Sequence, residues 1–165
     1  MGNGDKPYAL YYPHTGEGWS GISVEPYKIE EKTLYEQHVK PSFKGVLRHT
    51  LAASQADIKF HLRYFEIEPG GYTTFERHNH AHVVIGKRGV GIAIAGEEIY
   101  TLREDDILII KGGAPHQLLN REGEPFGFYC IVDADRDPPK PVTPIELEEL
   151  CKKNPKIHEY QRLLR

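Results

Sequence analysis

The central part of this 165-residue chain carries histidines and a glutamate at spacings that could bind a metal ion. Glu76 and His78 are two residues apart, and His82 follows after a short gap. His116 stands in a distant segment. Because a strand directs alternate side chains to the same face, Glu76 and His78 can face one interior. Three imidazoles and one carboxylate suit a divalent transition metal such as Fe, Mn, Ni, Cu or Zn, so we predict a metal site made by these four residues.

The spacing around the first three of these residues resembles the first sequence motif of the cupin superfamily. That motif is usually G-x5-H-x-H-x3-E-x6-G. Here Gly70, Glu76, His78, His82 and Gly89 keep every spacing, but the first His and the Glu have exchanged places. The ligand set implied by the resemblance is also three His and one Glu. A random pair of losses would not be expected to restore that set.

A second cupin motif, usually G-x5-P-x-G-x2-H-x3-N, has its counterpart in Asp105, Lys111, Gly113, His116 and Asn120. The spacing is again kept, while Asp105 replaces the leading Gly and Lys111 replaces the Pro. The resemblance implies a small jelly-roll barrel that binds one metal ion. It does not identify the reaction, because one fold hosts many functions.

His80 leaves a competing ligand set open. It has the same parity as Glu76, His78 and His82, so one straight strand would direct all four side chains to the same side. In that arrangement His80 would be the alternative metal ligand in place of Glu76. If the chain turns near residues 79–81, as the resemblance suggests, His80 lies at the rim, and this is the arrangement we expect. A solvated polar segment that binds no metal is the remaining alternative.

The pattern between residues 43 and 135 is that of short strands separated by turns. The run at 59–68 is rich in aromatic and β-branched residues and is followed by Pro69-Gly70-Gly71, which we expect to end it. About nine strands with no helix between them favour an all-β, antiparallel barrel, and the motifs select the jelly-roll form. The predicted strands are 43–51, 59–68, 72–78, 82–87, 90–95, 97–102, 107–110, 116–120 and 126–133.

The N-terminal part, residues 1–42, differs from the barrel domain at 43–135. It carries many Tyr residues with Pro and Gly and has no sustained period, so we expect an extended arm with a short helix at 30–40. Aromatic residues are enriched at interfaces, and the arm could pack on its own barrel or on that of a partner. We therefore predict a homodimer; a partly ordered tail is the alternative.

The C-terminal part, residues 136–165, is predicted to be a Pro-rich linker followed by helix. Thr143 has the character of an N-cap, with Pro144 at the first helical position. We expect a helix at 145–154 that ends before Pro155, and a last short helix at 156–165.

Net charge, apolar runs, the N-terminal sequence and the cysteines indicate which classes of protein this chain resembles. The net charge of -3 provides no basic excess for binding nucleic acid. No apolar run approaches the roughly 20 residues that span a membrane. The N-terminus lacks the pattern of a secretory signal, so we expect a cytoplasmic protein. Cys130 and Cys151 lack the spacing of a zinc or redox pair and are expected to be free thiols.

A metal centre in a small barrel predicts an enzyme that acts on a small polar organic acid. An oxygenase, isomerase, lyase or hydrolase reaction would be chemically open to it. The alternative is a non-catalytic cupin that binds or senses a small ligand. Arg63 and Tyr64 are adjacent on a predicted strand, so one of them must face inward. An inward Arg63 would suit a carboxylate and an inward Tyr64 proton transfer, so both are candidate catalytic residues, with ordinary packing as the alternative.

Overall fold

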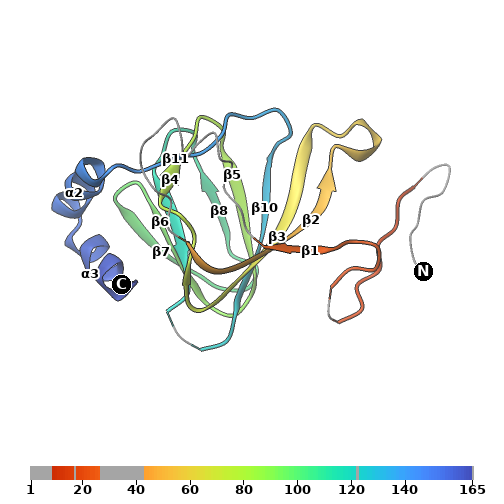
Figure 1. Cartoon of the computed structure of the whole chain (residues 1–165), viewed down its shortest axis with the longest axis horizontal. Coiled ribbons are helices and arrows are strands. Elements are labelled where there is room, and N and C mark those ends of the chain that lie inside the picture. Colours follow the sequence, from red (N-terminus) through yellow and green to blue (C-terminus); the bar gives the residue numbers. More distant parts are fainter. Residues whose placement is uncertain (1–8, 17, 27–42, 122, 165) are drawn as a thin grey trace.

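The structure, a computed structural model, describes residues 9–16, 18–26, 43–121 and 123–164. Within them the chain forms eleven strands, a short 3-10 helix and two α-helices (Figure 1). The strands are β1 (Val24–Pro26), β2 (Lys44–Ala53), β3 (Phe60–Tyr72), β4 (Glu76–Arg77), β5 (His82–Arg88), β6 (Gly91–Ala95), β7 (Glu98–Leu102), β8 (Ile107–Ile110), β9 (His116–Leu119), β10 (Phe126–Asp133) and β11 (Lys140–Pro141). The helices are η1 (Gln55–Asp57), α2 (Pro144–Lys153) and α3 (Pro155–Leu163).

The strands form one antiparallel sheet that folds over into a nearly closed barrel (Figure 1). One layer has the strand order β1–β2–β3–β10–β5–β8, and the other has the order β11–β4–β9–β6–β7. The layers join where Tyr72 of β3 pairs with Leu119 of β9. The predicted all-β, antiparallel jelly-roll barrel is confirmed.

Strand β3 is longer than predicted, because it continues through Pro69-Gly70-Gly71 to Tyr72. Its pairing with β2 changes register beside this segment, and Gly70 has a φ of 81°. The segment is therefore a bulge, which lets β3 leave one layer and enter the other. The expectation that the strand ends there was wrong, and the strand predicted at 72–78 is reduced to β4.

The turns of the two sequence motifs explain one of the substitutions noted above. Asp105 occupies the place of the leading Gly of the second motif and has a φ of 68°. Asp is among the few residues other than Gly that adopt this left-handed conformation readily. The exchange of Gly for Asp therefore keeps the turn between β7 and β8.

An apolar cluster fills the space between the two layers. The rings of Phe65 and Phe128 are stacked with their centroids 5.2 Å apart, and Phe126 is fully buried beside Phe128. Such a close-packed interior fixes the strands on which polar side chains are mounted. The buried members are Val46, Phe65, Ile67, Val84, Ala93, Leu102, Ile110, Leu118, Phe126, Phe128, Cys130 and Val132.

The two C-terminal helices pack against the outside of the second layer, at one end of the molecule (Figure 1). Ile157 of α3 is fully buried in a second apolar cluster with Ile94 and Leu119. The hydroxyl oxygen of Thr143 accepts a hydrogen bond of 3.2 Å from the N–H of Glu146, so the predicted N-cap is present. The predicted helical tail is confirmed.

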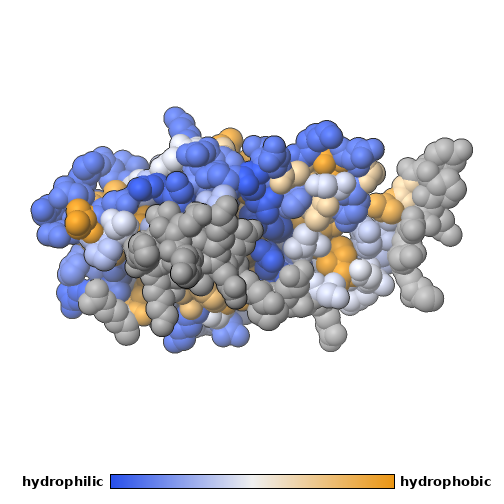
Figure 2. All heavy atoms as spheres, turned by 45° about the horizontal axis from the view of Figure 1, so that its top comes forward, coloured by the Kyte–Doolittle hydropathy of each residue, from blue (hydrophilic) through white to orange (hydrophobic). Residues whose placement is uncertain are grey.

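The described residues 9–16 and 18–26 lie on the outside of the first layer. Trp19 makes edge contacts with the rings of Tyr64 and His49, at centroid distances of 5.5 Å and 5.6 Å. The helix predicted at 30–40 lies outside the described residues. In the part of the chain that the structure describes, no helix is long and apolar enough to cross a membrane. On the face shown in Figure 2 hydrophilic side chains predominate, and hydrophobic ones form small groups.

Candidate metal centre

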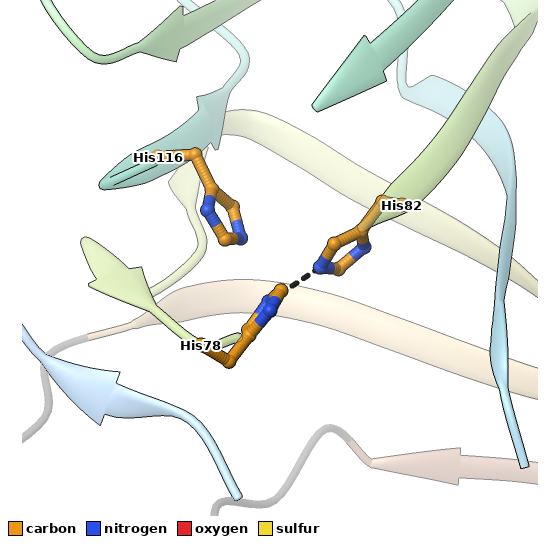
Figure 3. Close-up of side chains that lie close together, drawn as sticks. All are labelled: His78, His82 and His116. Atoms are coloured by element: carbon orange, nitrogen blue, oxygen red, sulfur yellow. Dashed lines mark hydrogen bonds between the residues drawn. The ribbon is translucent and has the colours of Figure 1, made fainter. Parts of the chain in front are cut away.

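Three histidines from separate segments converge inside the barrel. His78 follows β4, His82 is the first residue of β5, and His116 is the first residue of β9. Their rings point toward one another (Figure 3), and one ring nitrogen of each lies within 4.8 Å of the other two. The structure thus brings together three of the four residues predicted as metal ligands.

Hydrogen bonds to backbone carbonyls fix the protonation of two of these rings. The Nδ1 atom of His78 lies 2.8 Å from the carbonyl oxygen of His80, and that of His116 lies 2.9 Å from the carbonyl oxygen of Ala114. A carbonyl oxygen can only accept, so each Nδ1 carries the proton and donates it. The Nε2 atoms therefore keep their lone pairs, which are available to a metal ion.

The Nε2 atoms of the three rings converge on one point. Nε2 of His82 is 2.5 Å from Nε2 of His78, which can accept a hydrogen bond because the proton of His78 is on Nδ1 (Figure 3). Nε2 of His116 is buried and has no hydrogen-bond partner among the described residues. Three converging imidazole nitrogens, which bind a metal ion in their unprotonated form, are a donor set that fits a divalent transition metal.

Burial keeps these imidazoles in the neutral form that binds metals. It lowers the pKa of His78 to about 3 and that of His116 to about 4, and it lowers the pKa of His82 well below the usual value. All three rings are therefore neutral at pH 7. The Nδ1 atom of His82 lies 3.0 Å from the sulfur of Cys130, which orients the third ring.

Glu76 lies beside this centre but outside the group of three. It pairs with His116 across β4 and β9, and its side chain lines the same pocket. Its Oε2 atom is buried and has no hydrogen-bond partner among the described residues. Burial raises the pKa of Glu76 to about 8, although the charge of Arg63 acts in the opposite direction. This carboxyl group can therefore either hold a proton at pH 7 or ionise to bind a metal.

His80 takes a different role from its neighbours. The chain bends at residues 79–80 between β4 and β5, so the segment is not one straight strand. The Nδ1 atom of His80 lies 2.9 Å from a carboxylate oxygen of Asp137, and its ring stacks on that of His78 at 3.7 Å. Asp137 also accepts hydrogen bonds from the N–H of Asn79. His80 is thus tied to the segment that follows β10 and is not one of the three converging rings.

A pocket of about 690 Å³ opens onto the three histidines. Arg63 lines it, whereas the adjacent Tyr64 lies on the other face of the sheet, against Trp19 and Tyr129. Burial raises the pKa of Tyr64, which keeps its phenol protonated. Of the two candidate catalytic residues, only Arg63 lies near the metal centre.

The pocket also contains residues that the sequence did not single out as a site. Arg136 and Asp137 come from the segment predicted as a linker, which instead runs along the pocket and continues into β11. Arg48 of β2 and His61 of β3 also line it. Only His61 had a sequence signal, since it has the same parity as Arg63. Gln117, next to His116, faces away and accepts a hydrogen bond from Gln161 of α3.

Comparisons with known proteins agree with this architecture. The cupin domain family matches residues 63–132. A relative from Rhodospirillum rubrum, named 1-methylthio-D-xylulose 5-phosphate methylsulfurylase, is 33% identical over 148 residues, which cover 90% of this chain and 88% of the relative.

Two solved structures are similar along almost their whole length. A cupin 2 conserved barrel domain protein from Rhodopseudomonas palustris is 34% identical, with a TM-score of 0.77 over 91% of this chain and 97% of the other. A cupin-2 domain protein from Rhodospirillum rubrum is 30% identical, with a TM-score of 0.75 over 96% of this chain and 99% of the other. With the barrel, the possible three-histidine metal site and these relatives in hand, we conclude that the chain belongs to the cupin superfamily.

Proposed function

We propose that this protein is a metal-dependent enzyme whose substrate is a small phosphorylated keto sugar carrying a methylthio group. The observation that carries the proposal is the convergence of three neutral, buried Nε2 atoms at the end of a pocket. The name of the Rhodospirillum rubrum relative supplies the substrate class and a reaction at its methylthio group. The sequence predicted a small polar organic acid as the substrate. The named activity of the relative narrows that prediction to a phosphate ester.

His78, His82 and His116 would hold the metal, and Glu76 is the candidate fourth ligand. A divalent metal bound there would act as a Lewis acid on the keto oxygen of the substrate. The chemistry of the donor set fits Fe, Mn, Ni, Cu or Zn.

The remaining residues determine where protons are held and where water is excluded. When Glu76 is not a ligand, its raised pKa lets it hold a proton at Oε2 near pH 7 and exchange it with a bound substrate. Phe65, Val84 and Phe128 form an apolar wall of the pocket, which keeps bulk water from the buried carboxyl group. The contact between Nδ1 of His82 and the sulfur of Cys130 keeps the third imidazole oriented.

The direct test is turnover of 1-methylthio-D-xylulose 5-phosphate by protein loaded separately with Fe, Mn, Ni, Cu or Zn, with a small thiol added as the co-reactant that accepts the methylsulfur group. Proton NMR of the methylthio group would follow the reaction, and His116→Ala is the matched inactive variant. We expect the methylthio signal to shift with at least one metal and to stay unchanged with the variant. An unchanged signal with every metal would contradict the proposed reaction.

A second readout separates an enzyme from a ligand-binding protein. Mn²⁺-loaded protein should broaden the NMR lines of a substrate that binds next to the metal. Broadening without turnover would favour the non-catalytic, ligand-binding alternative. If neither broadening nor turnover is observed, this compound is not a ligand of the protein.

We also propose that the protein is a homodimer located in the cytoplasm. The support is the exposure of large apolar side chains: Leu47 is 43% exposed, Leu10 41% and Phe43 40%. Light scattering coupled to size-exclusion chromatography would test the dimer, and cell fractionation would test the location.

A further inference from the structure

Three arginines from separate parts of the chain line the pocket that opens onto the metal centre. Arg48 belongs to β2, Arg63 belongs to β3, and Arg136 follows β10. Their side chains lie in the same cavity as His78, His82 and His116. Three half-buried guanidinium groups in one cavity are an unusual arrangement, because like charges repel one another unless an anion lies between them.

The structure holds two of these arginines in defined positions. One amino nitrogen (Nη1) of Arg136 donates to Nδ1 of His61 at 3.0 Å and to the carbonyl oxygen of Asp133 at 2.9 Å. Arg63 lies over the ring of Phe65, with 5.2 Å between its guanidinium carbon and the ring centroid. A guanidinium that is fixed in this way loses little further freedom when it binds a ligand.

Arg63 has an unused donor inside the protein. Its Nε atom is buried and has no hydrogen-bond partner among the described residues. Its Nη2 atom makes a 3.5 Å contact with the sulfur of Cys130, which is a weak acceptor. A buried N–H without a strong acceptor is destabilising, and an incoming anion with several oxygens would satisfy it.

Two carboxyl groups also line the pocket. Asp137 accepts hydrogen bonds from the N–H of Asn79 and makes a polar contact with His80. Glu76 lies beside the three histidines, where it is the candidate fourth metal ligand. Burial lowers the pKa of His61, and the charges of Arg136, Arg63 and Arg48 lower it further. The charges of all three guanidinium groups therefore reach the same imidazole.

The strand order separates the region of the arginines from the metal centre. Arg63 on β3 and His82 on β5 are separated by β10, which pairs with both strands. Adjacent strands are about 4.8 Å apart, so the two backbones are roughly 10 Å apart. A ligand that reaches both regions would carry its anionic group and its reacting group at opposite ends of a short chain.

We infer that Arg63 and Arg136, with Arg48, form the subsite for the phosphate monoester of the substrate. This inference rests on the proposed function for the identity of the substrate. A phosphate group has enough acceptor oxygens for more than one guanidinium. It would leave the keto and methylthio end of a pentulose 5-phosphate directed toward the three histidines.

The test uses calorimetry to compare the binding of two small sugar probes to the metal-loaded protein. The probes are D-xylulose 5-phosphate and D-xylulose, which differ only in the phosphate. We expect the wild-type protein to bind the phosphate ester at least tenfold more tightly. Arg63→Gln and Arg136→Gln should each weaken its binding about 10- to 100-fold, as expected for a lost charged hydrogen bond, and leave D-xylulose unaffected.

Two further variants guard against loss of folding. Arg136→Lys keeps a positive charge and should restore part of the phosphate selectivity. Arg103→Gln is the matched control, because Arg103 is exposed and does not line the pocket. Metal content should stay at the wild-type level in every variant, which separates the anionic subsite from the metal centre.

The outcomes distinguish the subsite from the proposed reaction. Selective binding of the phosphate ester without turnover of the methylthio compound supports the subsite and overturns the reaction. Equal affinity of the wild-type protein for both probes overturns the subsite. An equal loss of affinity for both probes in Arg136→Gln also overturns the subsite, since the arginine would then only shape the pocket. If the sugar acid D-xylonate binds as tightly as the phosphate ester, the assignment to phosphate is wrong.

Discussion

The sheet formed by β2, β3 and β10 has a hollow on each face, and the two differ in chemistry more than in size. The inner one, of about 690 Å³, contains the three histidines and three arginines. The outer one, of about 870 Å³, is the larger and contains His14, Trp19, His49, Tyr64 and Tyr129. Both hold histidines, but in the outer hollow His14 and His49 each make an edge contact with Trp19. The convergence of three ring nitrogens, and not the volume of the hollow or the number of histidines, marks the candidate metal site.

The comparison also shows how neighbouring residues acquire different roles. Arg63 and Tyr64 are adjacent on β3, and the pleat directs one to each hollow. The inner face presents three arginines to the pocket. The outer face presents the rings of Tyr64 and Tyr129, which contact Trp19, beside the charged residues Glu66, Lys87 and Arg88. The first prediction replaces one histidine on each face of this sheet with alanine.

The largest expected effect is on metal content. His116→Ala should reduce bound metal from about one equivalent to less than about a tenth, because a neutral buried ligand is lost. His49→Ala, in the outer hollow, should leave it unchanged. Elemental analysis of the purified proteins measures both. Full metal retention in His116→Ala would show that the inner histidines are not the ligands.

The same measurement sharpens the assignment within the inner hollow. His82→Ala should also lose the metal, whereas His80→Ala should keep it, because His80 is held by Asp137. Loss of metal from His80→Ala alone would point to the competing ligand set.

The second prediction compares the two faces of β8 in stability. Ile110 is 2% exposed and belongs to the inner apolar cluster, while Ile107 of the same strand is 65% exposed. Ile110→Ala should lower the free energy of unfolding by about 2–5 kcal/mol, and Ile107→Ala by less than about 0.5 kcal/mol. Urea unfolding of the metal-loaded proteins checks both values. Similar losses would mean that the outer face of β8 is covered in solution.

The third prediction separates the adjacent residues of β3 by kinetics. Arg63→Gln should lower kcat/KM for a phosphorylated substrate by about 10- to 100-fold, since it removes a charged hydrogen-bond donor from the pocket. Tyr64→Phe should stay within about twofold of the wild type, because its hydroxyl is on the other face. A larger effect of Tyr64→Phe would require the outer hollow to take part in the reaction.

The smallest expected effect is the number of protons released when a metal ion binds at the inner site. The imidazoles of His78 and His116 are already neutral at pH 7, so they release no proton when a metal binds. Glu76, with a pKa of about 8, is mostly protonated at pH 7 and must release its proton to become a ligand. We therefore expect metal binding to release close to one proton at pH 7, and progressively less as the pH rises above 8.

Calorimetry in buffers of different ionisation enthalpy measures this release. Glu76→Gln is the matched control, since it has a similar shape and no proton to lose, and it should release almost none. Equal proton release from the wild type and from Glu76→Gln would exclude Glu76 as a ligand.

Much of the fold was accessible from the sequence, because its signals are local. The strands from β5 to β10 follow short apolar or alternating runs, and Thr143 with Pro144 marks the start of α2. The motif spacing also singled out His78, His82 and His116, the three rings that the structure brings together. These features depend on spacing along the chain, which the sequence contains in full.

The bulge at Pro69-Gly70-Gly71 marks the limit of such reasoning. Taken alone, Pro and two Gly residues indicate the end of a strand. The strand continues because Tyr72 finds a partner in Leu119, from a distant part of the chain. A pairing of this kind is not encoded in the local pattern.

The sequence by itself determined the barrel class and the helical tail, and it predicted a ligand set that includes the three converging histidines while leaving Glu76 and His80 as alternatives. Only the tertiary structure decided which of Arg63 and Tyr64 faces the pocket. Strand alternation places the two side chains on opposite faces of the sheet, but it does not say which face is the inner one. The tertiary structure alone brought Arg136 and Asp137 to the pocket, since a Pro-rich segment has no periodicity that could place it. The physical reason is the same in each case: local spacing fixes the direction of side chains relative to one another, and only long-range packing fixes the surface that they meet.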